Sequence, residues 1–268
     1  MSKTKRLLLV SLSYFFITYL FFARHWLFKS PPHYAGMFTD PLLFIWVFKW
    51  WLYSIQHHLN PLFCMLARAP VGISLMKITN IPLLGLLALP ITYLFGALTS
   101  YNFFLSLGPP ITAISLFLFL RYLIKNDIAA WFGGYLFGFS SFEITHYFAG
   151  HVNWVWLCFL PAIAWLCCAY MRQEIKKSMF VTLTTLMLIA QFLISKELFF
   201  TLNIALTLWA TLFFLLAWDQ RKQTIIVITA FLTALILALL FLSPLIVIYF
   251  CKPHSVVIYR ASHFAASL

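Results

Sequence analysis

The chain has 268 residues, of which 63% are hydrophobic and 9% charged, against roughly 45–50% and 25% in soluble globular domains. This composition excludes a soluble globular protein and indicates a polytopic membrane protein, in which lipid accommodates the 30 Phe, 12 Tyr and 10 Trp side chains. The net charge of +12 does not indicate nucleic-acid binding, because the basic residues lie mainly between apolar runs and no interleaved basic and aromatic motif occurs.

The first apolar run, Leu7 to Ala23, is uncharged and follows Lys3, Lys5 and Arg6. It is longer than the core of a signal peptide, which spans about 7–15 residues, and no A-x-A-like cleavage site follows. We therefore predict an uncleaved membrane anchor whose basic N-terminus is cytoplasmic.

Residues 24–80 are interrupted by cations and contain no run long enough to cross roughly 30 Å of hydrocarbon. We predict an extracytoplasmic loop over residues 29–80. Within it, residues 42–58 are apolar except for Lys49, Tyr53 and Gln56, which fall on one stripe at helical spacing. That pattern predicts a juxtamembrane helix lying in the membrane interface.

The remaining apolar runs predict membrane-spanning helices. Residues 81–120 are uncharged and divided by prolines, which favours two spans. Further runs cover residues 128–147, 152–171, 178–195, 198–218 and 223–251. With the anchor, the sequence predicts an all-α transmembrane bundle of about eight spans, which we treat as a single domain over residues 1–268.

Three clusters rich in Lys and Arg, at residues 121–127, 172–177 and 219–222, are separated by pairs of predicted helices and should share one side, the cytoplasm. The predicted spans conflict with this sidedness, because an odd number of them lies between the cytoplasmic N-terminus and residue 121. Either residues 81–120 hold one complete span and a re-entrant piece, or the charge rule misplaces these clusters.

Asp40 precedes Pro41 at the start of the predicted interfacial helix. An Asp before Pro is a common helix start, and locally an N-cap is the favoured interpretation. An Asp at the depth of the lipid headgroups is also placed to act as a catalytic base for a polar acceptor. One residue could serve both purposes.

Residues 141–154 form a polar link that contains Glu143, His146, His151 and Asn153. These side chains could bind a pyrophosphate or a sugar, or form a hydrated turn anchored by neighbouring Trp residues. We expect no metal and no cofactor, because the spacing of the two histidines matches no HExxH or HxH motif.

Three further charged residues are candidates for substrate binding. Arg68 and Lys77 lie in the long loop, where a cation can hold a lipid phosphate or simply extend its charge to the interface. Glu197, next to Lys196, divides two apolar runs and favours a tight turn over a buried functional carboxylate. The five cysteines form no CxxC pair and are interpreted as packing residues.

The order of short motifs resembles the GT-C superfamily of integral membrane glycosyltransferases, particularly bacterial members. The matching residues, over residues 7–251, are Asp40-Pro41, Asn60-Pro61, Pro70-Val71-Gly72 and Gly150-His151-Val152-Asn153. The resemblance implies transfer of a sugar from a polyprenyl-phosphate carrier to an acceptor at the outer face of the bacterial inner membrane.

In that family, Asp40 would be the first-loop acid that serves as base, and Arg68 or Lys77 would hold the carrier phosphate. His151 and Asn153 would line the donor or acceptor site. Members usually have more spans and often a soluble C-terminal domain, so we expect this chain to lack a C-terminal portion.

Two alternatives stay open. A transporter or flippase-like protein would use the intramembrane polar residues as its pathway, although the two halves show no convincing repeat. An inactive membrane-inserted fragment would depend on its polar residues for folding alone.

Overall fold

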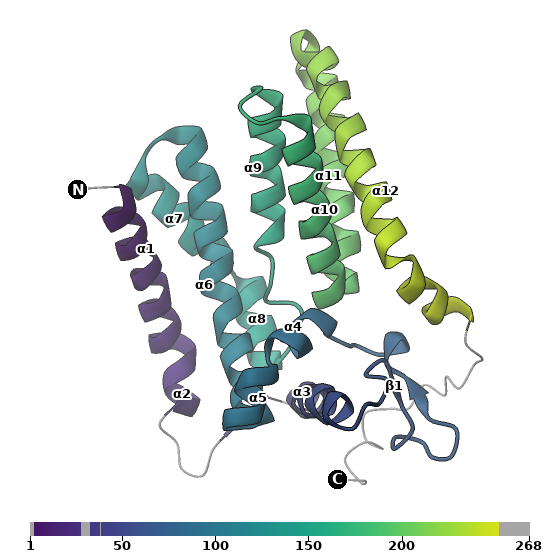
Figure 1. Ribbon diagram of the computed structural model, residues 1–268. Helices are drawn as coiled ribbons and strands as arrows, with labels where there is room; N and C mark the ends of the chain where they lie inside the picture. Colours follow the sequence, from purple (N-terminus) through teal and green to yellow (C-terminus); the bar gives the residue numbers. More distant parts are fainter. Residues whose placement is uncertain (1–2, 28–32, 38, 252–268) are drawn as a thin grey trace.

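The protein is an elongated helical bundle, shown in Figure 1 as a computed structural model that describes residues 3–27, 33–37 and 39–251. The first residues of the predicted loop, 29–32, and the C-terminal tail lie outside the described residues. Within them, strand structure is confined to a short antiparallel pair, β1 (Phe63–Cys64) and β2 (Ile73–Ser74). The all-α prediction is therefore confirmed for this part of the chain.

The N-terminal half begins with α1 (Lys3–Thr18), which continues through a π-helical turn (Tyr19–Ala23) into α2 (Arg24–Leu27). The helix α3 (Asp40–Gln56) follows, and the β1–β2 pair leads to a short 3-10 helix (Leu75–Lys77). Two short helices, α4 (Pro82–Leu87) and α5 (Leu89–Phe95), precede the long helix α6 (Ala97–Ile124).

The C-terminal half contains α7 (Asp127–Gly138), α8 (Ser141–Ala149), α9 (Phe159–Met171) and α10 (Lys177–Ile194). It ends with α11 (Lys196–Leu216), a 3-10 turn (Trp218–Gln220) and α12 (Arg221–Cys251). One buried cluster joins α1, α3, α6 and α7, and a second joins α9 to α12.

Five helical stretches of the described chain are long and apolar enough to cross a membrane, so the prediction of about eight spans is not supported. They are Thr4–Ala23, Ala97–Ile124, Lys177–Ile194, Lys196–Leu216 and Arg221–Tyr249. Because a helix rises about 1.5 Å per residue, the 13 residues of α9 cover only about 20 Å. Apolar composition alone did not reveal where helices break.

The run at residues 128–147 is divided between α7 and α8 by a capping serine. Ser140 accepts a hydrogen bond from the backbone N–H of Glu143, which starts a new helix. In residues 81–120, by contrast, Pro109 and Pro110 lie inside α6 without ending it, although each proline removes one backbone hydrogen bond of the helix. One long helix therefore replaces the two predicted spans.

The helix predicted at residues 42–58 is α3, which begins two residues earlier. Its exposed residues include Lys49, Tyr53 and Gln56, as the sequence predicted, and its opposite face is buried against α4, α5 and α6. Asp40 is the first residue of α3 and not its N-cap, because Thr39 occupies the cap position.

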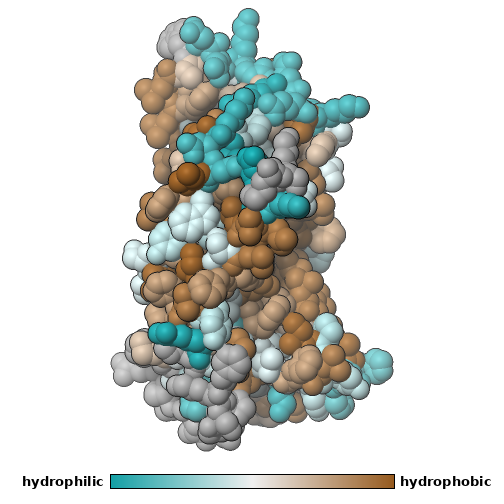
Figure 2. Space-filling model, turned by 90° about the vertical axis from the view of Figure 1, so that its left-hand side faces the viewer, coloured by the Kyte–Doolittle hydropathy of each residue, from teal (hydrophilic) through white to brown (hydrophobic). Residues whose placement is uncertain are grey.

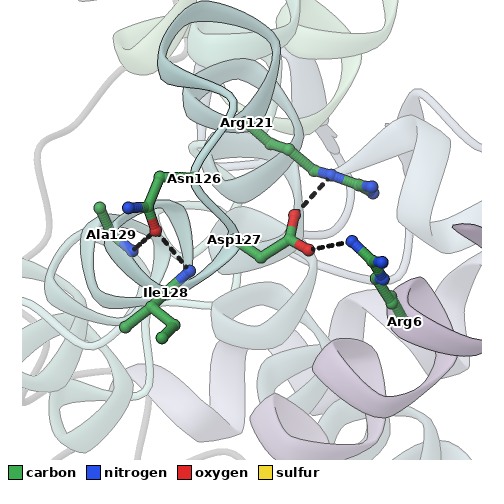
Figure 3. Close-up of polar contacts among 6 residues, drawn as sticks. All are labelled: Arg6, Arg121, Asn126, Asp127, Ile128 and Ala129. Atoms are coloured by element: carbon green, nitrogen blue, oxygen red, sulfur yellow. Dashed lines mark hydrogen bonds and ion pairs between the residues drawn. The ribbon is translucent and has the colours of Figure 1, made fainter. Parts of the chain in front are cut away.

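The clusters at residues 121–127, 172–177 and 219–222 lie with the first turn of α1 at one end of the bundle, which we call the charged end. Asp127 forms ion pairs with Arg6 at 2.9 Å and with Arg121 at 2.8 Å (Figure 3). Tyr122 donates a hydrogen bond of 2.9 Å to Glu174 in the connection between α9 and α10. Figure 2 shows hydrophilic residues gathered at this upper end of the molecule, above a largely hydrophobic middle.

This arrangement removes the conflict in the predicted sidedness. Before residue 121, only α1 with its π-helical turn and α6 are long and apolar enough to cross among the residues that the structure describes. An even number of crossings returns the chain to the end from which it started, as the Arg6–Asp127 ion pair requires. The helices α4 and α5 form the additional, incomplete piece at the other end of the bundle (Figure 1).

Candidate functional site

A chain of three polar side chains lies at the start of α3, far from the charged end. His151 Nε2 is 2.6 Å from Asp40 Oδ2, and His151 Nδ1 is 2.8 Å from His146 Nδ1. The side chain of Asp40 is 48% exposed and that of His151 29% exposed. A carboxylate thus meets an imidazole pair where solvent has access.

The local backbone explains this contact. The helix α8 ends at Gly150, whose φ of +81° is in the left-handed region, and His151 N–H donates back to the carbonyl of His146 at 2.9 Å. A Cβ at Gly150 would lie 2.5 Å from Pro41 Cγ, so only glycine lets the start of α3 approach this turn. The close approach brings Asp40 to His151.

Two residues of α6, Tyr101 and Asn102, fix the backbone before Asp40 and the turn before His151. The Tyr101 hydroxyl lies 2.9 Å from the carbonyl of Ala35 and 3.1 Å from that of Gly150. The neighbouring Asn102 side chain accepts from Ala35 N–H at 2.7 Å and donates to His33 C=O at 2.9 Å. Neither residue was predicted from the sequence, although Asn102 is a polar side chain within an apolar run, which is a sign of hydrogen bonding between segments.

His146 is held between aromatic rings. Its ring centroid is 4.4 Å from that of Phe142 and 4.6 Å from that of Trp154. Burial, and then the neighbouring His151, lower the pKa of His146 from its ordinary value. The two facing Nδ1 atoms can share only one proton, so one of the rings accepts and the other donates.

Glu143 lies one helical turn before His146 but belongs to the interior. Its side chain is fully buried, and neither carboxylate oxygen has a hydrogen-bond partner among the described residues. Burial raises the pKa of Glu143 well above its ordinary value. The nearby Thr112 hydroxyl partly offsets this rise in the pKa. Its own hydrogen bond, at 3.5 Å, is to the Val155 carbonyl. Asn153, in the turn after His151, is also buried.

The other predicted substrate-binding residues lie in separate elements. Arg68 lies between β1 and β2, and Lys77 ends the 3-10 helix that follows β2. Glu197 is in the first turn of α11 and accepts a hydrogen bond of 2.9 Å from Ser195, which is the only residue between α10 and α11. This connection is the tight turn that the sequence favoured.

Lys196 in that turn was not predicted to be important, yet it joins two parts of the fold. Its Nζ donates to the carbonyl of Met76 at 2.8 Å and lies 3.4 Å from the carbonyl of Ile78. The start of α11 is thereby fixed to the segment after β2.

The site around Asp40 has one carboxylate and two imidazoles, which are potential metal ligands. Their nitrogen and oxygen atoms, however, contact one another in a row, from Asp40 to His151 to His146. Across the described ranges, no group of three or more His, Cys, Asp or Glu side chains converges on a point where a metal ion could bind. The arrangement is suited to accepting, holding and passing on a proton.

Comparison with known proteins gives no match: no family model, no curated protein and no solved structure resembles the chain significantly.

Proposed function

We propose that the protein is a membrane glycosyltransferase that moves a sugar from a polyprenyl-phosphate carrier to an acceptor at the extracytoplasmic face, with Asp40 as the base. The contact between Asp40 and His151 carries this proposal, because there an imidazole orients a half-exposed carboxylate. A carboxylate held in this way is suited to removing a proton from an acceptor hydroxyl.

In the proposed reaction, the acceptor oxygen attacks the anomeric carbon of the donor sugar while Asp40 takes the hydroxyl proton. A new carbon–oxygen bond forms as the bond to the carrier phosphate breaks, and the phosphate leaves with the bonding electrons. His151 Nε2, 2.6 Å from Asp40 Oδ2, keeps the Asp40 carboxylate oriented while the carboxylate takes up the proton. Arg68 or Lys77 would stabilise the charge on the departing carrier phosphate.

The charged end supports the proposed orientation. Lys and Arg near short connections favour the cytoplasm, which would place the first turn of α1 inside. Asp40 then lies on the extracytoplasmic side, with α3 in the interface and residues 29–80 as the extracytoplasmic loop. The bacterial inner membrane is the location that the family resemblance implies.

A transferase assay in liposomes tests the proposal. The purified chain is given a panel of labelled polyprenyl-phosphate sugars and compared with its Asp40→Asn variant. Glu174→Gln is the matched control, since Glu174 is an exposed carboxylate at the charged end. Transfer by the parent and control but not by Asp40→Asn would support the proposal. Transfer undiminished in Asp40→Asn would remove Asp40 as the base.

One observation favours a second candidate, a transporter. Glu143 is fully buried with both oxygens unpaired among the described residues, and such carboxyl groups commonly mark a pathway for protons or ions. A transporter would lose flux in Glu143→Gln and tolerate Asp40→Asn. An inactive fragment would show neither transfer nor flux from folded protein.

A further inference from the structure

A second site lies at the charged end, far from Asp40. A cavity of about 580 Å³ opens between the last turn of α9, the C-terminal part of α11 and the start of α12. Arg172 and Asp219 line its polar part, and Trp209 and Phe213 line its apolar part. We call this the α9–α11 groove.

The depth of the groove points to a lipid ligand. α11 and α12 are long and apolar enough to cross a membrane, and the groove lies where the first ends and the second begins. In a membrane crossed by these two helices, that level would correspond to the lipid headgroups, with hydrocarbon alongside the helices below. Trp209 and Phe213, both on α11, would contact the glycerol and upper acyl carbons, as interfacial aromatic rings do.

The charges of the groove select among headgroups. Arg172 offers a guanidinium, which binds phosphate oxygens through two parallel hydrogen bonds, and Gln220 and Gln223 add amide donors. Asp219 offers a carboxylate in the same groove, which would repel a headgroup that carries only negative charge. A headgroup with a phosphate and an ammonium complements both residues.

The ring of Tyr122 positions the Arg172 guanidinium at the edge of the groove. The Arg172 guanidinium carbon lies 4.8 Å from the centroid of the Tyr122 ring, which supports one face of its plane. The nearby carboxylate of Glu174 instead accepts from the Tyr122 hydroxyl at 2.9 Å. Both Arg172 and Asp219 are exposed.

We propose that the α9–α11 groove binds phosphatidylethanolamine, with Arg172 on the phosphate and Asp219 on the ammonium group. This inference does not depend on the glycosyltransferase proposal, because it uses residues at the opposite end of the bundle. It assigns a structural or regulatory lipid to this end of the protein.

Native mass spectrometry of the delipidated full chain in detergent tests this site. Phosphatidylethanolamine and phosphatidylglycerol are titrated separately, and the apparent affinity for each is measured. The variants are Arg172→Gln and Asp219→Asn, and Lys125→Gln is the control because Lys125 is an exposed cation of the charged end outside the groove.

We expect the parent chain to bind phosphatidylethanolamine roughly tenfold more tightly than phosphatidylglycerol, the size of one charge-assisted contact. Arg172→Gln should weaken both lipids, Asp219→Asn should abolish the preference between them, and Lys125→Gln should change neither. Equal binding of the two lipids by the parent would overturn the proposal. So would a preference that persists in Asp219→Asn.

Discussion

His151 Nε2 lies 2.6 Å from Asp40 Oδ2, although the two residues are 111 positions apart in the chain. The turn at Gly150 and the start of α3 meet closely enough that a Cβ at Gly150 would clash with Pro41. The pairing is therefore a property of how two helix ends pack.

Replacing His151 by Asn should lower kcat of the proposed transfer by roughly 10- to 100-fold, because Asp40 loses the group that orients it. Asp40 itself stays in place, so KM for the donor should change little. The matched control is His57→Gln, since His57 is an exposed residue directly after α3 whose Nδ1 lies 2.9 Å from the Tyr53 carbonyl. Unchanged kcat in His151→Asn would show that the contact has no role in the reaction.

Tyr101→Phe should destabilise the protein by about 1–3 kcal/mol, because the buried carbonyls of Ala35 and Gly150 both lose the hydroxyl. Thermal unfolding in detergent measures the effect. Tyr93→Phe, at an exposed tyrosine of α5, should leave the unfolding temperature unchanged. Equal stability of the two variants would mean that Tyr101 does not hold the two loops together.

Glu143 should make stability depend on pH. Its folded-state pKa is raised by burial, so the folded protein binds a proton that the unfolded chain releases as pH rises above the ordinary glutamate pKa. Between the ordinary glutamate pKa and the raised pKa of Glu143 in the folded protein, the free energy of unfolding should therefore fall as pH rises. The slope should be up to about 1.4 kcal/mol per pH unit. Thermal unfolding of Glu143→Gln should lack this slope. An equal slope in the variant would assign it to other groups.

The charged end should be cytoplasmic. Single cysteines at Lys125, Lys176 and His57, in a cysteine-free background, can be labelled in intact cells with a membrane-impermeant thiol reagent. All three positions are exposed. We expect labelling at His57 in intact cells and at Lys125 and Lys176 only after permeabilisation. The reverse pattern would invert the protein and place Asp40 in the cytoplasm.

The sequence was sufficient to predict a helical membrane protein and the helix that begins near Asp40, because apolar runs and their polar stripes are local properties. The number of spans could not be predicted, since an apolar run indicates burial in lipid or in protein without distinguishing them. Gly134 and Gly138 of α7, for example, pack closely on Ala113 of α6. The apolar residues of α7 are therefore partly buried in protein, and residues 128–147 are divided between two helices and do not form one span.

The candidate site was predicted in its parts but not in its connections. Asp40, His146 and His151 were each singled out by residue type and position. Their contacts depend on packing between segments far apart in the chain, which no local pattern encodes. Arg68, Lys77 and Glu197 share the residue types expected of a phosphate or sugar site, but they lie in other elements.

The role of Asp40 as the base is tested most directly by the rate of sugar transfer by Asp40→Asn in liposomes containing labelled polyprenyl-phosphate donors. We expect the parent chain to transfer sugar and the variant, with the same unfolding temperature, to be slower by roughly 100- to 10,000-fold. Transfer at the parent rate by Asp40→Asn would contradict the assignment of Asp40 as the base, and absence of transfer by the folded parent with every donor would contradict the proposed function.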